Sequence, residues 1–227
     1  MSMQPEDILY IDNHLIAVNK KPGEISQGDK TGDPSLLETV KEYLKVTYNK
    51  PGNVYLGLVH RLDRPVSGVL LFARTGKAAE RMSTMIRERR FRKIYWAVVK
   101  NRPFEESATL EHYLIKNQHQ NKSYVTGASN PGARKASLSY QLVRSLERYY
   151  LLEVQLHTGR HHQIRSQLAA IGSPIRGDIK YGFDRSNSDG SIHLHARSIT
   201  FEHPVTHAEV TIIANPPHDP IWNACSQ

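Results

Sequence analysis

Residues 60–73 read HRLDRPVSGVLLFA, a charged and turn-prone segment that runs directly into an apolar one. Another short apolar run, residues 55–59, precedes it, so we expect the charged segment to be a loop between two strands. Such loops often carry chemistry, because a rigid scaffold holds their polar side chains in place. Asp63 lies between Arg61 and Arg64, and a carboxylate beside guanidinium groups stays charged and can act as a nucleophile or base. The same residues are equally consistent with a local surface ion pair.

Composition indicates an ordinary soluble protein. The chain has 227 residues, of which 39% are hydrophobic and 23% are charged. Its single cysteine, Cys225, excludes a disulfide framework and a cysteine-based metal cluster. No apolar run approaches the length of a membrane span, and the N-terminus lacks the pattern of a signal peptide. We therefore expect a cytoplasmic protein with no membrane association.

The positive charge is concentrated in one stretch. The formal net charge is +8, and residues 81–102 contain eight basic residues against the single acidic Glu88. A concentrated excess predicts a surface that faces phosphates, although a solvated helix face gives the same pattern. The basic residues of this stretch are Arg81, Arg87, Arg89, Arg90, Arg92, Lys93, Lys100 and Arg102.

Hydrophobic periodicity predicts more strands than helices. Helical spacing covers residues 36–48, preceded by the capping pattern of Ser35 and Glu38, and residues 77–90. A third helix is expected over residues 166–171 and a terminal turn over residues 220–224. Strands are expected at 8–11, 15–18, 94–99, 109–115, 123–126, 136–143, 149–156, 192–201 and 209–214. This order predicts an α+β fold with a mixed, mainly antiparallel sheet and flanking helices. We find no interdomain linker, so residues 1–227 are expected to form a single domain.

Six segments carry a family resemblance. The loop HRLDRPVSG resembles the HRLD-x-x-Thr-Ser-Gly motif of the RluA-type pseudouridine synthases, with Val66 in place of the threonine. Five other segments resemble further motifs of that family in the same order: IAVNKKPG (16–23), KIYWAVV (93–99), TGRHHQIR (158–165), GDIKYG (177–182) and HLHA (193–196). The resemblance implies the pseudouridine synthase catalytic fold with a central RNA-binding cleft, and no metal or cofactor. Few residues precede the first motif, so the chain is most similar to small members without an S4 domain, such as the TruC subgroup.

The resemblance also implies roles for individual residues. Asp63 would be the nucleophile, and Arg165 would pair with it and hold it ionised. Tyr95 would stack on the target uracil and move a proton, although a strand tyrosine is more often plain core. Leu194 would pack against the base, and Arg61 would displace the flipped nucleotide. The candidates for phosphate contacts are Lys20, Lys21, Arg64, Arg87, Arg89, Arg90 and Arg92.

These features predict an isomerase, an RNA pseudouridine synthase that acts as a monomer on uridines of structured tRNA or rRNA. One alternative is a non-catalytic RNA-binding or chaperone module on the same fold. Another is a metal-dependent hydrolase built on the histidine clusters, although their spacing matches no familiar helical zinc motif. We expect His60 and His162 to orient their neighbours by hydrogen bonds. The clustered histidines are His157, His161, His162, His193 and His195.

Overall fold

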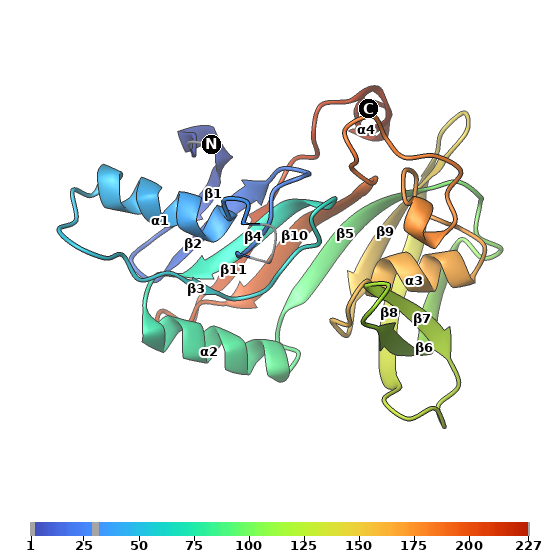
Figure 1. Cartoon of the computed structure of the whole chain (residues 1–227), viewed down its shortest axis with the longest axis horizontal. Helices are drawn as coiled ribbons and strands as arrows, with labels where there is room; N and C mark the ends of the chain where they lie inside the picture. The colour runs from blue at the N-terminus through green and yellow to red at the C-terminus, as the bar shows by residue number, and fades with distance from the viewer. Residues whose placement is uncertain (1–2, 29–31, 227) are drawn as a thin grey trace. The chain divides into compact units, whose positions relative to one another are not determined.

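The computed structural model describes residues 3–28 and 32–226 (Figure 1). The chain divides into two compact units, one made of Met1–Phe91 with Ala196–Pro216 and the other of Arg92–His195 with Pro217–Gln227. Each unit has its own helices and mainly antiparallel strands, so the predicted α+β class is confirmed. That the whole chain behaves as one domain stays a prediction.

The first unit is built around strand β4 (Ser67–Ala73). Its strands follow the order β1-β2-β4-β10, with β3 beside β4 and β11 beside β10. Strand β2 runs antiparallel to β4, with Leu15 opposite Ala73 and Lys20 opposite Gly68. The other elements are η1 (Pro5–Asp7), β1 (Ile8–Ile11), β2 (Leu15–Lys20), α1 (Leu36–Thr47), β3 (Gly57–Leu58), α2 (Gly76–Arg87), β10 (Leu194–Glu202, which begins in the second unit) and β11 (Glu209–Ile213).

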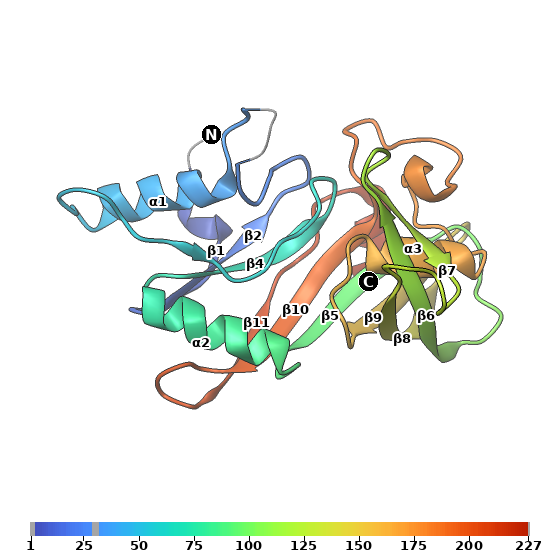
Figure 2. The ribbon, with the colours of Figure 1, turned by 60° about the horizontal axis from the view of Figure 1, so that its bottom comes forward.

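Strand β4 is covered on both faces, and every one of its residues is buried. Helices α1 and α2 lie on the two sides of its sheet (Figures 1 and 2). Met82 and Met85 of α2 pack in one core cluster with Leu71 of β4. A strand buried on both faces needs a continuous apolar run, which the segment VLLFA supplies.

The ends of the helices follow from local chemistry. The Ser35 hydroxyl accepts a hydrogen bond from the Glu38 N–H at 3.3 Å, which confirms the predicted N-cap of α1. Helix α2 ends at Arg87, earlier than predicted, because Arg89 adopts a left-handed backbone with φ of 60°. Arg89 and Arg90 therefore lie beyond the helix.

The predicted strand at residues 55–59 is mostly wrong. Only Gly57–Leu58 form a strand, and they pair with the final two residues of β4, Phe72 and Ala73. Tyr55 is exposed and precedes this short contact.

The second unit contains a five-stranded antiparallel arrangement in the order β5-β9-β8-β6-β7. Helix α3 lies beside β6 and β7 (Figure 2). The predicted terminal turn is a longer helix, α4, whose Trp222 packs against Val98 and Leu151. The elements are β5 (Arg92–Val99), β6 (Ser107–Asn117), β7 (Lys122–Thr126), β8 (Arg134–Ser145), β9 (Tyr150–Leu156), α3 (Gln163–Ala170), η2 (Ile179–Tyr181) and α4 (Pro220–Ser226). None of the helices in the described residues is both long and apolar enough to cross a bilayer.

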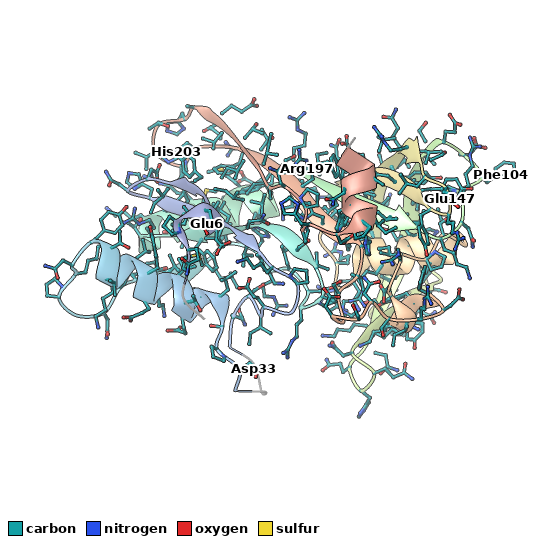
Figure 3. The ribbon with its side chains drawn as sticks, turned by 90° about the horizontal axis from the view of Figure 1, so that it is seen from above. Glu6, Asp33, Phe104, Glu147, Arg197 and His203 are labelled. Carbon is teal, nitrogen blue, oxygen red and sulfur yellow. The ribbon has the colours of Figure 1, made fainter. Side chains whose placement is uncertain are left out.

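An ion-pair contact between buried His203 and half-buried Asp12 joins two hairpins of the first unit. His203, labelled in Figure 3, lies in the loop after β10, and its Nε2 atom is 2.8 Å from Oδ2 of Asp12. The other oxygen of Asp12 accepts hydrogen bonds from the N–H groups of His14 and Leu15, each at 2.7 Å. One carboxylate thus joins the β1–β2 turn to the β10–β11 hairpin.

The first prediction concerns Gly68, which has φ of +114° and whose added Cβ would lie 2.3 Å from the Ala196 carbonyl oxygen. We expect Gly68→Ala to lower the free energy of unfolding by more than about 2 kcal/mol, because both the backbone conformation and the space exclude a side chain. Chemical denaturation measures this change. Gly76→Ala is the control, since no heavy atom lies within 4 Å of its added Cβ and alanine favours a helix. Equal stability of the two variants would contradict the argument.

Candidate functional site

The segment that carries Asp63 is an irregular loop that several hydrogen bonds hold in place. The Ser26 hydroxyl donates to the Leu62 carbonyl at 3.0 Å and accepts from the Leu62 N–H at 3.2 Å. The Val66 N–H donates to the Asp63 carbonyl at 3.0 Å, which closes a tight turn. The Asp63 side chain itself is half-buried. The loop therefore holds a carboxylate on a backbone that these hydrogen bonds fix in place.

Lys20 supports this loop through hydrogen bonds to backbone carbonyls. It is the last residue of β2 and is fully buried, and its ammonium donates to the carbonyls of Lys21 at 3.1 Å, Arg64 at 3.1 Å and Val66 at 2.7 Å. Burial lowers the pKa of Lys20 to about 8, and the charges of Glu24 and Asp63 oppose that shift. A buried ammonium is not presented to phosphate, so a loop-supporting role replaces the phosphate contact predicted from the sequence.

The other basic candidates of the first unit are exposed. Arg64 pairs at 3.0 Å with Asp33, labelled in Figure 3, and its Nε donates to the Gly23 carbonyl at 3.1 Å. Lys21 forms a 3.0 Å ion pair with Asp7. Arg61, Arg87, Arg89 and Arg90 are also exposed.

The basic stretch is less uniform than its sequence suggests. Arg90 pairs with Glu88 at 3.3 Å and with Glu202 at 3.2 Å. Lys100 pairs with Asp184 at 2.6 Å, and Arg102 pairs with Glu106. Four of the eight basic residues belong to the second unit, where Arg92 is exposed at the start of β5. Arg87 at the end of α2 and Arg89 just after it are therefore the clearest candidates for phosphate contacts.

Tyr95 and Leu194 are buried residues of the second unit, with 8% and 4% of their surface exposed. Lys93 precedes Tyr95 by two positions on β5, so both side chains point to the same face of the sheet. Burial lowers the pKa of Lys93 to about 8. Leu194 lies between His193 and His195, and both histidine rings contact Trp222. The Trp222 ring stacks on His193 with centroids 5.2 Å apart and meets His195 edge-on at 5.9 Å.

Arg165 lies on α3 and is almost fully buried. Its Nε and Nη2 atoms donate to the two oxygens of Asp178 at 2.7 and 2.8 Å, a bidentate pair. The sequence predicted Asp63 as the partner of Arg165 and gave Asp178 no role. Asp63 and Arg165 belong to different units, so that predicted partnership stays a prediction.

Polar side chains of the TGRHHQIR segment fix the start of α3. The Gln163 amide accepts from the Thr158 hydroxyl at 2.8 Å and from the Arg160 N–H at 2.9 Å. It also donates to the Ser137 carbonyl of β8 at 3.0 Å. This segment is thereby joined to the sheet that carries Tyr95.

The histidines form hydrogen bonds and ring contacts. His60 Nε2 accepts from the Leu71 N–H at 3.3 Å, and His162 Nδ1 lies 2.9 Å from the Tyr181 hydroxyl, which confirms the predicted orienting bonds. His161 stacks on His162 at 3.8 Å. Among residues 3–28 and 32–226, no group of three or more His, Cys, Asp or Glu side chains is arranged to hold a metal ion. The geometry that a histidine-based hydrolase would need is therefore not formed by these residues.

Solved structures share the fold. The chain superposes on human RNA pseudouridylate synthase domain containing 4 with a TM-score of 0.81 over 97% of this chain and 92% of that one, at 23% identity. Human RNA pseudouridylate synthase domain containing 1 gives a TM-score of 0.73 at 22% identity, over 99% of this chain and 90% of that one. The fold is thus that of a pseudouridylate synthase domain.

The sequence gives the family. The model described as RNA pseudouridylate synthase matches residues 14–170, which is more than half of the chain. The chain therefore belongs to the RNA pseudouridylate synthase family, and the resemblance to RluA-type enzymes is confirmed. It is 30% identical to tRNA pseudouridine synthase C of Vibrio cholerae over 95% of this chain and 92% of that protein.

Other relatives are longer. An RNA pseudouridine synthase of Synechocystis is 29% identical over 94% of this chain, and ribosomal large subunit pseudouridine synthase D of Borreliella burgdorferi is 30% identical over 87%. The chain spans 66% and 61% of the length of these two relatives.

Sequence reasoning missed Ser26 and Asp178 as supporting residues. The GDIKYG motif contained the signal for Asp178, because an acidic residue in a tight turn suits a buried arginine. Ser26 had no such signal, because its bond to Leu62 joins residues 36 positions apart in an irregular segment.

The second prediction concerns Lys20. Between pH 8 and 10.5 the folded protein has lost the Lys20 proton while the unfolded chain keeps it, so this group makes the free energy of unfolding rise with pH in that window. Lys20→Met removes that rise, and it lowers stability at pH 7 by about 2 kcal/mol or more because it leaves carbonyls without a donor. Urea unfolding at several pH values measures both effects.

Lys21→Met is the matched control for Lys20, since it removes a neighbouring but exposed lysine. We expect it to change stability by less than about 1 kcal/mol. A Lys20 variant with the same pH dependence as the wild type would contradict the assignment of the low pKa.

Proposed function

We propose that this chain is an RNA pseudouridine synthase that isomerises uridine in tRNA or rRNA. The observation that carries the proposal is the Asp63 loop, which the buried Lys20 ammonium holds by its carbonyls within the segment that matches the family. The relatives' names supply the RNA classes, since they include a tRNA pseudouridine synthase and ribosomal large subunit pseudouridine synthases. Uridine and pseudouridine are isomers, so the proposed reaction consumes no external cofactor. The proposed active form is a monomer.

Asp63 is the proposed nucleophile. The reaction breaks the glycosidic bond and reattaches uracil through C5, and a covalent intermediate divides this into easier steps. A nucleophile must be fixed in position, because small displacements cost large factors in rate. The bonds from Ser26 and Lys20 support this role, since they fix the backbone on both sides of Asp63.

Three residues of the second unit complete the proposed machinery. Arg165 pairs with the Asp63 carboxylate and orients it. Tyr95 stacks on the uracil and moves a proton, and Leu194 packs against the base. Their support is their burial on β5, α3 and β10, together with their places in the family motifs.

RNA binding uses the exposed arginines. A target base inside folded RNA must leave the stack before chemistry, and Arg61 takes the place of the flipped nucleotide. Lys21, Arg64, Arg87, Arg89, Arg90 and Arg92 are the proposed phosphate contacts, each on the surface of its own unit. Arg87 and Arg89 contribute most, because Arg90 and Arg64 already have carboxylate partners.

The third prediction tests the nucleophile. Asp63→Asn removes the nucleophilic oxygen charge but keeps the shape, so we expect it to abolish tritium release from RNA labelled at C5 of uridine while leaving RNA affinity within about threefold. Wild-type turnover by this variant would show that Asp63 is not the nucleophile.

The matched control is Asp184→Asn, which makes the same change at an exposed carboxylate in an ion pair with Lys100. We expect this variant to react at the wild-type rate. A wild-type protein that binds tRNA and rRNA but yields no pseudouridine in either would instead favour the non-catalytic RNA-binding module.

The fourth prediction tests the basic end of α2. Arg87→Ala and Arg89→Ala should each weaken RNA binding uniformly across sequences and reduce the slope of log affinity against log salt by about 1, because each removes one phosphate contact. Filter binding at several salt concentrations measures the slope. Arg148→Ala removes an exposed arginine beside Glu147 and should leave the slope unchanged. If all three variants kept the wild-type slope, neither Arg87 nor Arg89 would contact phosphate.

A further inference from the structure

The turn formed by residues 177–182 holds the edge of the Arg165 guanidinium. Asp178 accepts from both Nε and Nη2, at 2.7 and 2.8 Å, and the two side chains are 1% and 6% exposed. Two parallel hydrogen bonds fix the rotation of the guanidinium within its own plane. The edge that Asp178 binds is the one that includes Nε, so Nη1 points away from this carboxylate.

The same turn holds the face of the guanidinium. The Arg165 guanidinium carbon lies 5.1 Å from the centroid of the Tyr181 ring, within the range of a cation–π contact. The Tyr181 hydroxyl accepts from the Ser123 N–H at 2.8 Å and lies 2.9 Å from Nδ1 of His162. The ring is therefore anchored to β7 and to the start of α3, and it supports the guanidinium from one side.

The backbone of the turn explains why both residues reach one side chain. Asp178 and Tyr181 are three positions apart around the 3₁₀ helix η2, and side chains at that spacing eclipse one another. Gly177 has φ of +85°, and a Cβ there would lie 2.8 Å from the Ser191 carbonyl oxygen. Gly182, with φ of +97°, ends the turn. The pattern Gly-Asp-x-x-Tyr-Gly thus encodes a rigid turn with two aligned side chains.

We propose that Asp178 and Tyr181 are positioning residues that fix the guanidinium of Arg165 in one orientation, Asp178 by its edge and Tyr181 by its face. This inference rests on the proposed function of Arg165. An arginine on a flexible side chain would lose much of its rotamer freedom on binding a second carboxylate, and a guanidinium that is already fixed avoids that loss.

Side-chain NMR tests the positioning without any reference to activity. In wild-type protein labelled with 15N-arginine, we expect Arg165 to show an Nε–H signal with hindered rotation and separate Nη proton signals. Asp178→Asn should collapse these signals and Tyr181→Ala, which removes the ring, should weaken the hindrance, whereas Asp184→Asn should retain them. A freely rotating Arg165 in the wild type would overturn the proposal, whether or not the protein makes pseudouridine.

A double-mutant cycle tests the consequence for the reaction. Asp178→Asn should lower the single-turnover rate of tritium release by about 100-fold, with RNA affinity unchanged within about threefold. In an Arg165→Lys background the same substitution should cost less than about threefold, because the group that Asp178 positions is gone. Equal losses in the two backgrounds would show that Asp178 acts independently of Arg165 and would overturn the proposal.

Two further measurements separate the possible causes of failure. Thermal unfolding of each variant sets an assay temperature at which all are folded, and Asp178→Glu, which keeps the charge, should recover at least part of the lost rate. If the wild type releases no tritium at all, the proposed function fails, while the NMR result still decides whether the turn fixes Arg165.

Discussion

The buried ammonium of Lys20 is the interaction on which the candidate active loop depends. A charged group without water needs strong hydrogen bonds, and Lys20 obtains them from three carbonyls, those of Lys21, Arg64 and Val66. Two of those carbonyls, Arg64 and Val66, belong to the residues just after Asp63, so the desolvated charge and the shape of the loop are linked. The lowered pKa of Lys20 reflects the desolvation that this arrangement imposes.

Strand β4 connects that loop to the core of the first unit. Its residues are all buried, and at its second residue, Gly68, the backbone of Ala196 approaches too closely for any side chain. Tight packing on both faces leaves the strand little freedom. Because the loop leads directly into this strand, the end of the loop is fixed in position. A nucleophile requires such a fixed position.

The second unit uses a different means to hold Arg165, its proposed catalytic arginine. Arg165 lies in a buried polar network that includes Asp178, Tyr181, His162 and Ser123. Breaking a buried ion pair is costly because it leaves an unpaired charge, so this network holds Arg165 in a defined geometry. His162 adopts a left-handed backbone with φ of 51°, a conformation of the kind that proteins retain where surrounding contacts require it.

The sequence by itself determined the α+β class, most strands and helices, and the family, because apolar periodicity, capping residues and ordered motifs are local patterns. It also singled out Asp63, Tyr95 and Arg165. Tertiary structure decided what those patterns could not express. It made Lys20 a buried support instead of a phosphate contact, shortened the predicted strand before the loop, and ended α2 before Arg89. It also gave Arg165 a partner in Asp178. Burial and pairing depend on which residues distant in sequence come together in the fold. The identity of a lysine or arginine does not specify whether its charge faces water or a carboxylate.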